Sequence, residues 1–95
     1  MTRRISIRFC IGEGAETITA EGRVAWALLQ LIVADERGCT PIDNPAPRWS
    51  AYVFKLRRLG VSVETIHEPH GGPFSGTHAR YVLRSTINVL EPAHG

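Results

Sequence analysis

Basic side chains gather between residues 46 and 60, in a stretch that contains no acid. Its cations are Arg48, Lys55, Arg57 and Arg58. A guanidinium can donate to both acceptors of a guanine edge, and either kind of cation can neutralise a phosphate. Arg48 and Ser50 come at the start of a predicted helix, the end that approaches the bases in many nucleic-acid-binding proteins. We therefore expect Arg48 and Ser50 to meet base edges, and the three later cations to meet phosphates.

A second group of cations lies downstream, where Arg80 and Arg84 fall in the acid-free stretch 69–90. The acids collect mainly upstream, at Glu13, Glu16, Glu21, Asp35, Glu36 and Asp43. The net charge of +2 gives weak support for a nucleic-acid partner, but this polarised distribution gives more. Arg80, His78 and the backbone amides of Gly71, Gly72 and Gly76 are accordingly expected to contact a flanking phosphate or the minor groove.

Potential metal ligands share the same downstream region, at His67, Glu68, His70 and His78. Pro69 and the flexible Gly71-Gly72 pair argue against a fixed tetrahedral set, and no cysteine lies nearby. Ser50 and Ser75 lack the glycine pattern of a nucleophile elbow, and residues 71–76 lack the Lys and Ser/Thr of a phosphate-binding loop. We therefore expect no metal, no cofactor and no enzyme activity.

The 95 residues, 43% hydrophobic and 21% charged, suit one ordinary globular domain. Cys10 and Cys39 lack CxxC spacing, and we interpret both as small buried or half-buried hydrophobes. The apolar run 24–34 is too short to cross a bilayer, and an apolar signal core does not follow the basic start. These observations predict a cytoplasmic protein.

Two amphipathic helices must position these side chains. The helix predicted over residues 47–59 presents an outward face that includes Ser50, Ala51, Phe54, Arg57 and Arg58. Phe54 on this face indicates either a contact to thymine methyls or sugars, or a protein interface. The helix predicted over residues 21–37 has Thr19 as N-cap, Glu21 in its first turn and Gly38 as its stop.

Trp26 and Val33 lie seven residues apart, on the side of the first helix opposite its main apolar stripe. Two interpretations of this second apolar surface are open. An N-terminal hairpin can lie over it, or it can form a contact in a homodimer.

Shorter elements complete the predicted chain. Alternating residues predict an N-terminal hairpin over 4–19 and two strands over 61–66 and 80–84, joined by a long loop over 67–78. Prolines at 41, 45 and 47 limit residues 40–45 to a single short turn. The segment after Thr86 is expected to be a short, loosely held tail.

Four sequence motifs, in this order of elements, resemble those of the small winged-helix proteins of bacterial phages and prophages. They are GRVAWAL at 22–28, GCTPI at 38–42, PRWSAYV at 47–53 and ETIHEPHGGPF at 64–74. The resemblance covers roughly residues 17–85. It implies an α+β winged helix-turn-helix with an N-terminal β-hairpin and an abbreviated second helix. In such a fold the helix from Pro47 to Leu59 would be the recognition helix, and the loop over 68–79 would be the wing.

The resulting prediction is one winged-helix domain over residues 1–95. It comprises an N-terminal hairpin (4–19), a helical core (20–60), a wing hairpin (61–85) and a short tail (86–95). The first functional hypothesis is a non-catalytic module that binds double-stranded DNA, a small phage-type regulator with helix 47–59 in the major groove. The alternative is a protein-interaction module on the same scaffold, such as an antirepressor, an inhibitor of a host defence complex or an assembly factor.

Overall fold

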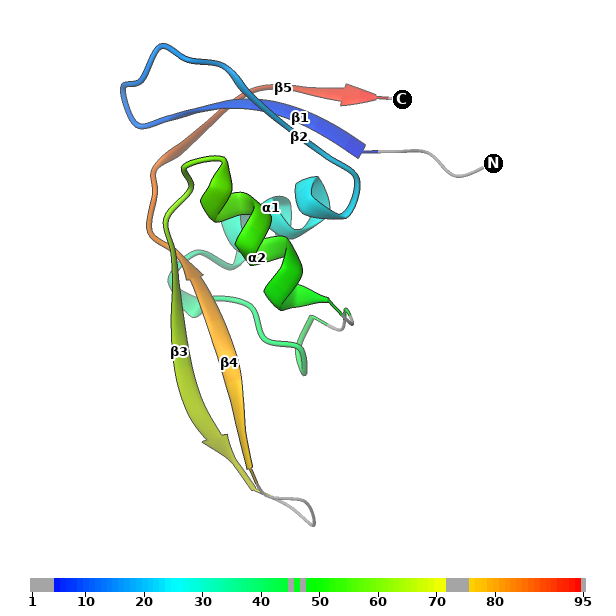
Figure 1. The fold of residues 1–95 in the computed structure, drawn as a ribbon, viewed down its shortest axis with the longest axis vertical. Coiled ribbons are helices and arrows are strands. Elements are labelled where there is room, and N and C mark those ends of the chain that lie inside the picture. The colour runs from blue at the N-terminus through cyan, green and yellow to red at the C-terminus, as the bar shows by residue number, and fades with distance from the viewer. Residues whose placement is uncertain (1–4, 45, 47, 72–75, 95) are drawn as a thin grey trace.

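The elements divide into three parts along the molecule. The computed structural model describes residues 5–44, 46, 48–71 and 76–94. A three-stranded sheet lies at one end, two helices lie in the middle, and a long two-stranded hairpin projects at the other end (Figure 1). The principal extents are 46 × 36 × 20 Å. The predicted α+β architecture with an N-terminal hairpin is therefore confirmed.

The three-stranded sheet has β1 (Ile5–Ile11) at its centre. It pairs antiparallel with β2 (Ile18–Glu21) on one side and with β5 (Ile87–His94) on the other. The expectation of a loosely held tail is thus wrong. β5 follows β1 from Ile11↔Ile87 to Ile5↔His94, with a register shift between Arg8 and Phe9. Without β5, one edge of β1 would carry unpaired backbone N–H and C=O groups, and pairing satisfies them.

The first helix, α1 (Gly22–Ala34), follows β2 directly. The predicted N-cap is wrong, because β2 includes Thr19, and Glu21 takes the cap position without a side-chain cap hydrogen bond. Gly22 turns the chain from strand into helix with a φ of +64°, a conformation that glycine adopts at little cost. A 3-10 turn, Asp35–Arg37, extends the helical segment to Gly38, which ends it as predicted.

A single turn takes the place of a second full helix. The amide of Asn44 donates to the carbonyl of Thr40 over 2.9 Å, and the amide of Asp43 donates to Thr40 Oγ1, also over 2.9 Å. Trp49 Nε1 donates to the carbonyl of Asn44 over 2.6 Å and so connects this turn to the next helix. That helix, α2 (Trp49–Arg58), lies within the predicted range of 47–59, although Pro47 is outside the described residues.

The projecting hairpin consists of β3 (Val63–His70) and β4 (Gly76–Leu83), paired from Val63↔Leu83 to His70↔Gly76. The predicted loop over 67–78, and the wing loop over 68–79, are therefore too long, because strand pairing continues through Glu68↔His78. Alternating side chains near the tip are polar on both faces, so hydrophobic periodicity did not reveal the strands there. The predicted first strand also began two residues early, at Val61.

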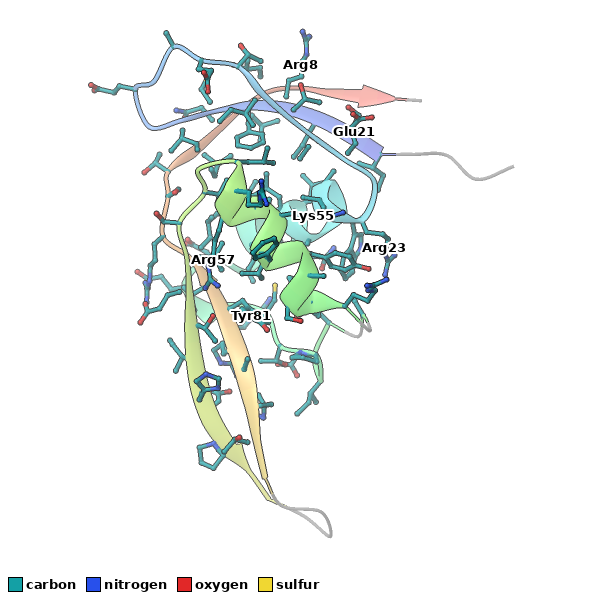
Figure 2. The ribbon with its side chains drawn as sticks, viewed as in Figure 1. Arg8, Glu21, Arg23, Lys55, Arg57 and Tyr81 are labelled. Carbon is teal, nitrogen blue, oxygen red and sulfur yellow. The ribbon has the colours of Figure 1, made fainter. Side chains whose placement is uncertain are left out.

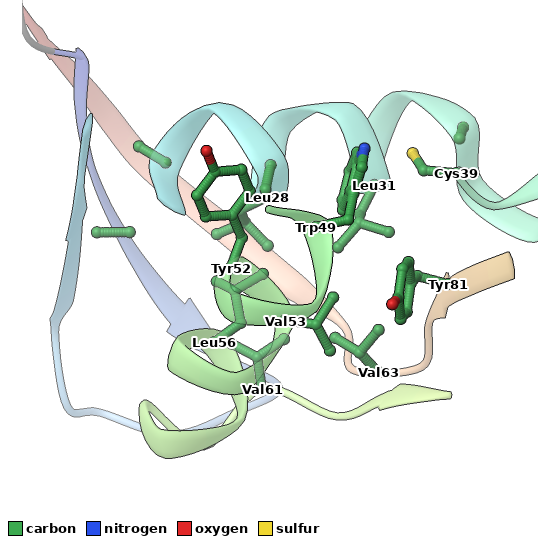
Figure 3. Close-up of a cluster of buried hydrophobic side chains, with 14 of the residues drawn as sticks. Leu28, Leu31, Cys39, Trp49, Tyr52, Val53, Leu56, Val61, Val63 and Tyr81 are labelled. Atoms are coloured by element: carbon green, nitrogen blue, oxygen red, sulfur yellow. The ribbon is translucent and has the colours of Figure 1, made fainter. Parts of the chain in front are cut away.

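Apolar side chains from all three parts form one core (Figure 3). The helices contribute Leu28, Leu31, Val53 and Leu56, and β1 contributes Ile7 and Phe9. The rings of Trp49 and Tyr81 stack with centroids 5.9 Å apart, where α2 meets the hairpin. Removing a buried leucine from such a core costs about 2–5 kcal/mol. The core therefore fixes the orientation of α2 against the sheet and the hairpin.

Cys39 belongs to this core and joins it to β4. Its amide and carbonyl exchange hydrogen bonds of 2.8 Å with those of Tyr81. Burial raises the pKa of the Cys39 thiol to about 11, so the thiol is protonated at neutral pH. Cys10 is half-buried, and neither cysteine is in a disulfide. The interpretation of both as buried or half-buried hydrophobes is confirmed.

The two residues of the second apolar surface of α1 have different surroundings. Trp26 is half-buried and its ring lies 5.5 Å from that of Trp49, so α2 covers much of it. Val33 is 79% exposed, so the N-terminal hairpin does not lie over it. The expectation that the hairpin covers both is wrong for Val33. The sheet instead packs on α1 with its buried side chains Ile7, Phe9 and Ala20.

Candidate nucleic-acid interface

One side of α2 faces solvent and carries the predicted contact residues. The side of α2 that is buried in the core consists of Trp49, Tyr52, Val53 and Leu56. The opposite side leaves six exposed residues, namely Arg48, Ser50, Phe54, Lys55, Arg57 and Arg58, with Ala51 half-buried among them. The amphipathic pattern predicted for this helix is confirmed. Phe54 is 58% exposed, and the guanidinium of Arg58 lies 5.8 Å from the centre of its ring.

The cations of α2 differ in how their nitrogens are used. Arg57 Nη2 donates to the carbonyl of Val63 over 2.7 Å and to Thr65 Oγ1 over 2.9 Å, so this side chain braces α2 against β3 (Figure 2). The side chains of Arg48 and Lys55 form no hydrogen bond or ion pair with any other residue that the structure describes. These two exposed cations, with Arg58, are the ones available to a ligand.

The hairpin cations are committed to acids on the neighbouring strand. Arg80 Nη2 and Nε lie 2.7 and 3.0 Å from Glu68 Oε1, and Arg80 Nη1 donates to the carbonyl of Arg37 over 2.7 Å. His78 Nε2 lies 2.8 Å from the same Glu68 oxygen. Hydrogen bonds from Arg80 and His78 lower the pKa of Glu68 from 4.5 to about 2. Glu68 is therefore ionised at neutral pH and offsets part of the hairpin's positive charge.

The acid-free appearance of residues 69–90 is a property of the linear sequence only. Antiparallel pairing places Glu68 across from His78, and it brings Glu64 within 2.6 Å of Arg84. The expected basic wing is thus largely neutralised by acids from β3. This outcome corrects the predicted charge distribution, because strand register rather than sequence distance decides which charges meet.

The remaining predicted residues of the wing lie near its tip. Gly71 is exposed, whereas Gly72 is outside the described residues. His67 is exposed on β3, and of the potential ligands His67, Glu68 and His78 only Glu68 and His78 are paired in the structure. Within residues 5–44, 46, 48–71 and 76–94, no three His, Cys, Asp or Glu side chains are grouped to hold a metal ion.

Arg23 is a further residue of the candidate interface, although sequence reasoning did not select it. Its Nε donates to the hydroxyl of Tyr52 over 3.3 Å, and its guanidinium lies 4.8 Å from the centre of the Trp26 ring. Arg23 and Lys55 lie on the same side of the molecule (Figure 2) and line one groove together with Arg48. Arg23 is the one charged residue of the first helix, Gly22–Ala34, and this was the sequence signal that it has a particular role.

Two helices connected by a short turn, with the second helix exposed beside a projecting hairpin, define a winged helix. The family model of the winged helix domain matches residues 17–93, so this chain belongs to that family. The match includes most of β5, which supports its place in the fold. A search of the curated proteins and a search of the solved structures found no match. No described helix is long and apolar enough to cross a membrane.

Proposed function

We propose that this protein is a non-catalytic module that binds double-stranded DNA, a small regulator of the phage or prophage type. Winged-helix domains are in general DNA-binding modules, and the match over residues 17–93 supports that general function. The observation that carries the specific proposal is the solvent-facing side of α2, where Arg48, Lys55 and Arg58 are exposed. Such a regulator acts where its DNA is, in the cytoplasm.

In this proposal α2 enters the major groove with its N-terminal half toward the bases. Arg48 and Ser50 donate to base edges, and Ala51 and Phe54 contact thymine methyls. Lys55 and Arg58 bind phosphates, which set the register of the helix on the duplex. Arg57 has one role within the fold already, since it donates to Val63 and Thr65, and any phosphate contact must use its remaining nitrogen.

The hairpin has a smaller electrostatic role than the sequence indicates. Arg80 and His78 are bound to Glu68, so a phosphate has to compete with that carboxylate for them. The exposed backbone at Gly71, followed by Gly72, is the part of the wing that we propose for a flanking contact. The interaction of the wing with DNA is accordingly one of shape and backbone amides more than of charge.

A mobility-shift measurement tests the proposal. At low salt, the wild-type protein is expected to bind random-sequence duplex, and replacing Arg48, Lys55 and Arg58 together by Ala is expected to weaken binding at least tenfold. Arg84→Ala is the matched control, because Arg84 is another exposed cation but pairs with Glu64 on the hairpin. Absence of wild-type binding, or unchanged binding by the triple variant, would contradict the proposal.

A second candidate function is a protein-interaction module on the same scaffold, an antirepressor, an inhibitor of a host defence complex or an assembly factor. Phe54 favours it, because this exposed ring lines an apolar groove together with Ala20, Val24 and Leu59. A pull-down from host lysate separates the candidates. A partner retained after nuclease treatment and lost with Phe54→Ala supports the second candidate, whereas a partner lost on nuclease treatment supports DNA binding.

The homodimer stays a prediction. Val33 is exposed and available for a contact between copies, but Trp26 already packs against Trp49 and offers only its remaining surface. A dimer contact on α1 would therefore be centred on Val33.

A further inference from the structure

A groove of about 850 Å³ lies between the start of α1 and the outward side of α2. Three cations line it, namely Arg23 from α1, Lys55 from α2 and Arg48 at the N-cap position of α2. Its walls also include Trp26, Tyr52 and Ala51, and Glu21 is the acid among the lining residues. The groove adjoins the side of α2 that we propose for base contacts, so a strand of DNA bound there would have part of its backbone beside it.

The Arg23 guanidinium is held in place before any ligand arrives. It donates to the Tyr52 hydroxyl through Nε and lies over the rings of Trp26 and Tyr52, at 4.8 and 5.8 Å from their centres. Its two Nη groups donate to no residue in the described part of the chain. A planar cation that is already oriented loses less side-chain entropy on binding than a mobile one, and its two Nη groups match two oxygens of a phosphate.

A single turn replaces the helix that would otherwise precede α2, so no full helix at this position can cross the DNA backbone. In a helix-turn-helix the helix that precedes the recognition helix crosses the DNA backbone. Here that segment is the single turn at Thr40–Asn44, in which Ile42 and Asp43 are exposed and the only charge is negative. The groove instead offers three cations that form no ion pair with a described residue, with Arg23 on α1.

We propose that this groove binds the phosphate backbone of the DNA duplex that α2 contacts, with Arg23 as the central phosphate ligand. The proposal rests on the DNA-binding function above and adds to it the course of one strand. Arg48 and Lys55 flank the bound backbone, and the turn at Thr40–Asn44 makes no phosphate contact. Glu21 lies at the groove and repels phosphate, so it limits how far the strand extends toward β2.

The salt dependence of binding tests the role of Arg23. Each phosphate contact contributes about −0.9 to the slope of log Kobs against log salt. Arg23→Gln is therefore expected to make the slope shallower by about 0.9, and Arg23→Lys, which keeps the charge, to preserve it. Arg84→Gln removes the same charge outside the groove and is expected to leave the slope unchanged. Circular dichroism melts of each variant verify that the fold is intact.

A second variant tests the groove without removing a cation. Glu21→Gln eliminates the lining acid and is expected to tighten duplex binding several-fold at low salt, with the gain lost at high salt. Because Glu21 has no side-chain hydrogen bond at the start of α1, this substitution leaves the helix intact. Unchanged affinity for Glu21→Gln would count against a phosphate in the groove.

The outcomes separate this inference from the function on which it rests. If the wild-type protein binds no duplex, the proposed function fails and the groove proposal fails with it. If the wild type binds, α2 variants weaken binding and Arg23→Gln keeps the full slope, the groove proposal alone is overturned. Equal loss of slope in Arg23→Gln and Arg84→Gln also overturns it, because that result reflects net charge rather than a site.

Discussion

At the scale of single residues, local hydrogen bonds decide which cations can bind a ligand. Arg57, Arg80 and Arg84 are arginines like Arg23 and Arg48, yet each of the first three binds an acceptor on the hairpin or beside it. Glu68 and Glu64, the acid partners of Arg80 and Arg84, come close when strands β3 and β4 pair. Arg57 instead binds Val63 and Thr65 on the strand that follows α2. The charge available for DNA is therefore concentrated at α2 and the groove, although the sequence carries cations in both halves.

Glu68 provides a test of the hairpin ion pairs. Its pKa is lowered from 4.5 to about 2 in the folded protein, so its contribution to stability is complete above pH 4.5 and is lost as the pH falls toward 2. Urea unfolding at several pH values should show that Glu68→Gln is less stable than wild type at pH 7. The difference should shrink between pH 4.5 and 2. A difference that stays constant over this range would show that Glu68 does not make these pairs in solution.

At the scale of elements, the contact between Gly38 and β4 joins the helices to the hairpin. Gly38 has φ +72° and ψ −179°, a backbone conformation confined essentially to glycine. A Cβ at this position would lie 2.7 Å from the carbonyl oxygen of Tyr81 and 2.9 Å from Val82 Cγ2. The close approach allows the backbone of Cys39 to form hydrogen bonds with that of Tyr81. It therefore sets where the hairpin leaves the helical core.

Gly38→Ala is therefore expected to reduce the free energy of unfolding by about 2–4 kcal/mol, from backbone strain and the steric clash together. Gly12→Ala is the control, because Gly12 has φ +56° but nothing within 4 Å of a built Cβ. It should cost only about 1–2 kcal/mol, the backbone part. Thermal or urea unfolding measures both. Equal losses in the two variants would contradict the close approach at Gly38.

At the scale of the whole molecule, a small net charge accompanies a local basic surface. The chain carries +2 overall, but Arg23, Arg48, Lys55 and Arg58 surround the groove and the outward side of α2. The sheet at one end and the hairpin at the other extend the molecule to 46 Å along its longest axis. We assign none of their cations to DNA binding. Affinity should then depend on few phosphate contacts and be moderate.

The number of chains per binding site follows from the same reasoning. Three phosphate contacts from one chain, those of Arg23, Lys55 and Arg58, predict a slope of about −2.7 for log Kobs against log salt. Titrations at several salt concentrations measure it, and sedimentation of the complex gives the stoichiometry. A slope of about −5.4 with two chains per duplex site would show instead that a dimer binds. Loss of that doubling in Val33→Glu would place the dimer contact on α1.

Local patterns in the sequence were sufficient for the helices and for the outward residues of α2. Trp49, Tyr52, Val53 and Leu56 recur at helical spacing, and such spacing determines which side of a helix is buried whatever it packs against. The prolines near Thr40 likewise excluded a second full helix, because proline cannot continue one. The exposed positions of Arg48, Ser50, Phe54, Lys55 and Arg58 follow directly from these patterns.

Only the tertiary structure decided the pairings between distant segments. The return of β5 to β1, the ion pairs of Glu68 with Arg80 and His78, and the approach of Arg23 to Arg48 and Lys55 each join residues far apart in the chain. Strand register and helix packing bring these residues together, and neither is encoded in a local periodicity. By itself the sequence determined which side chains face outward, whereas the fold decided which of those side chains remain available to a ligand.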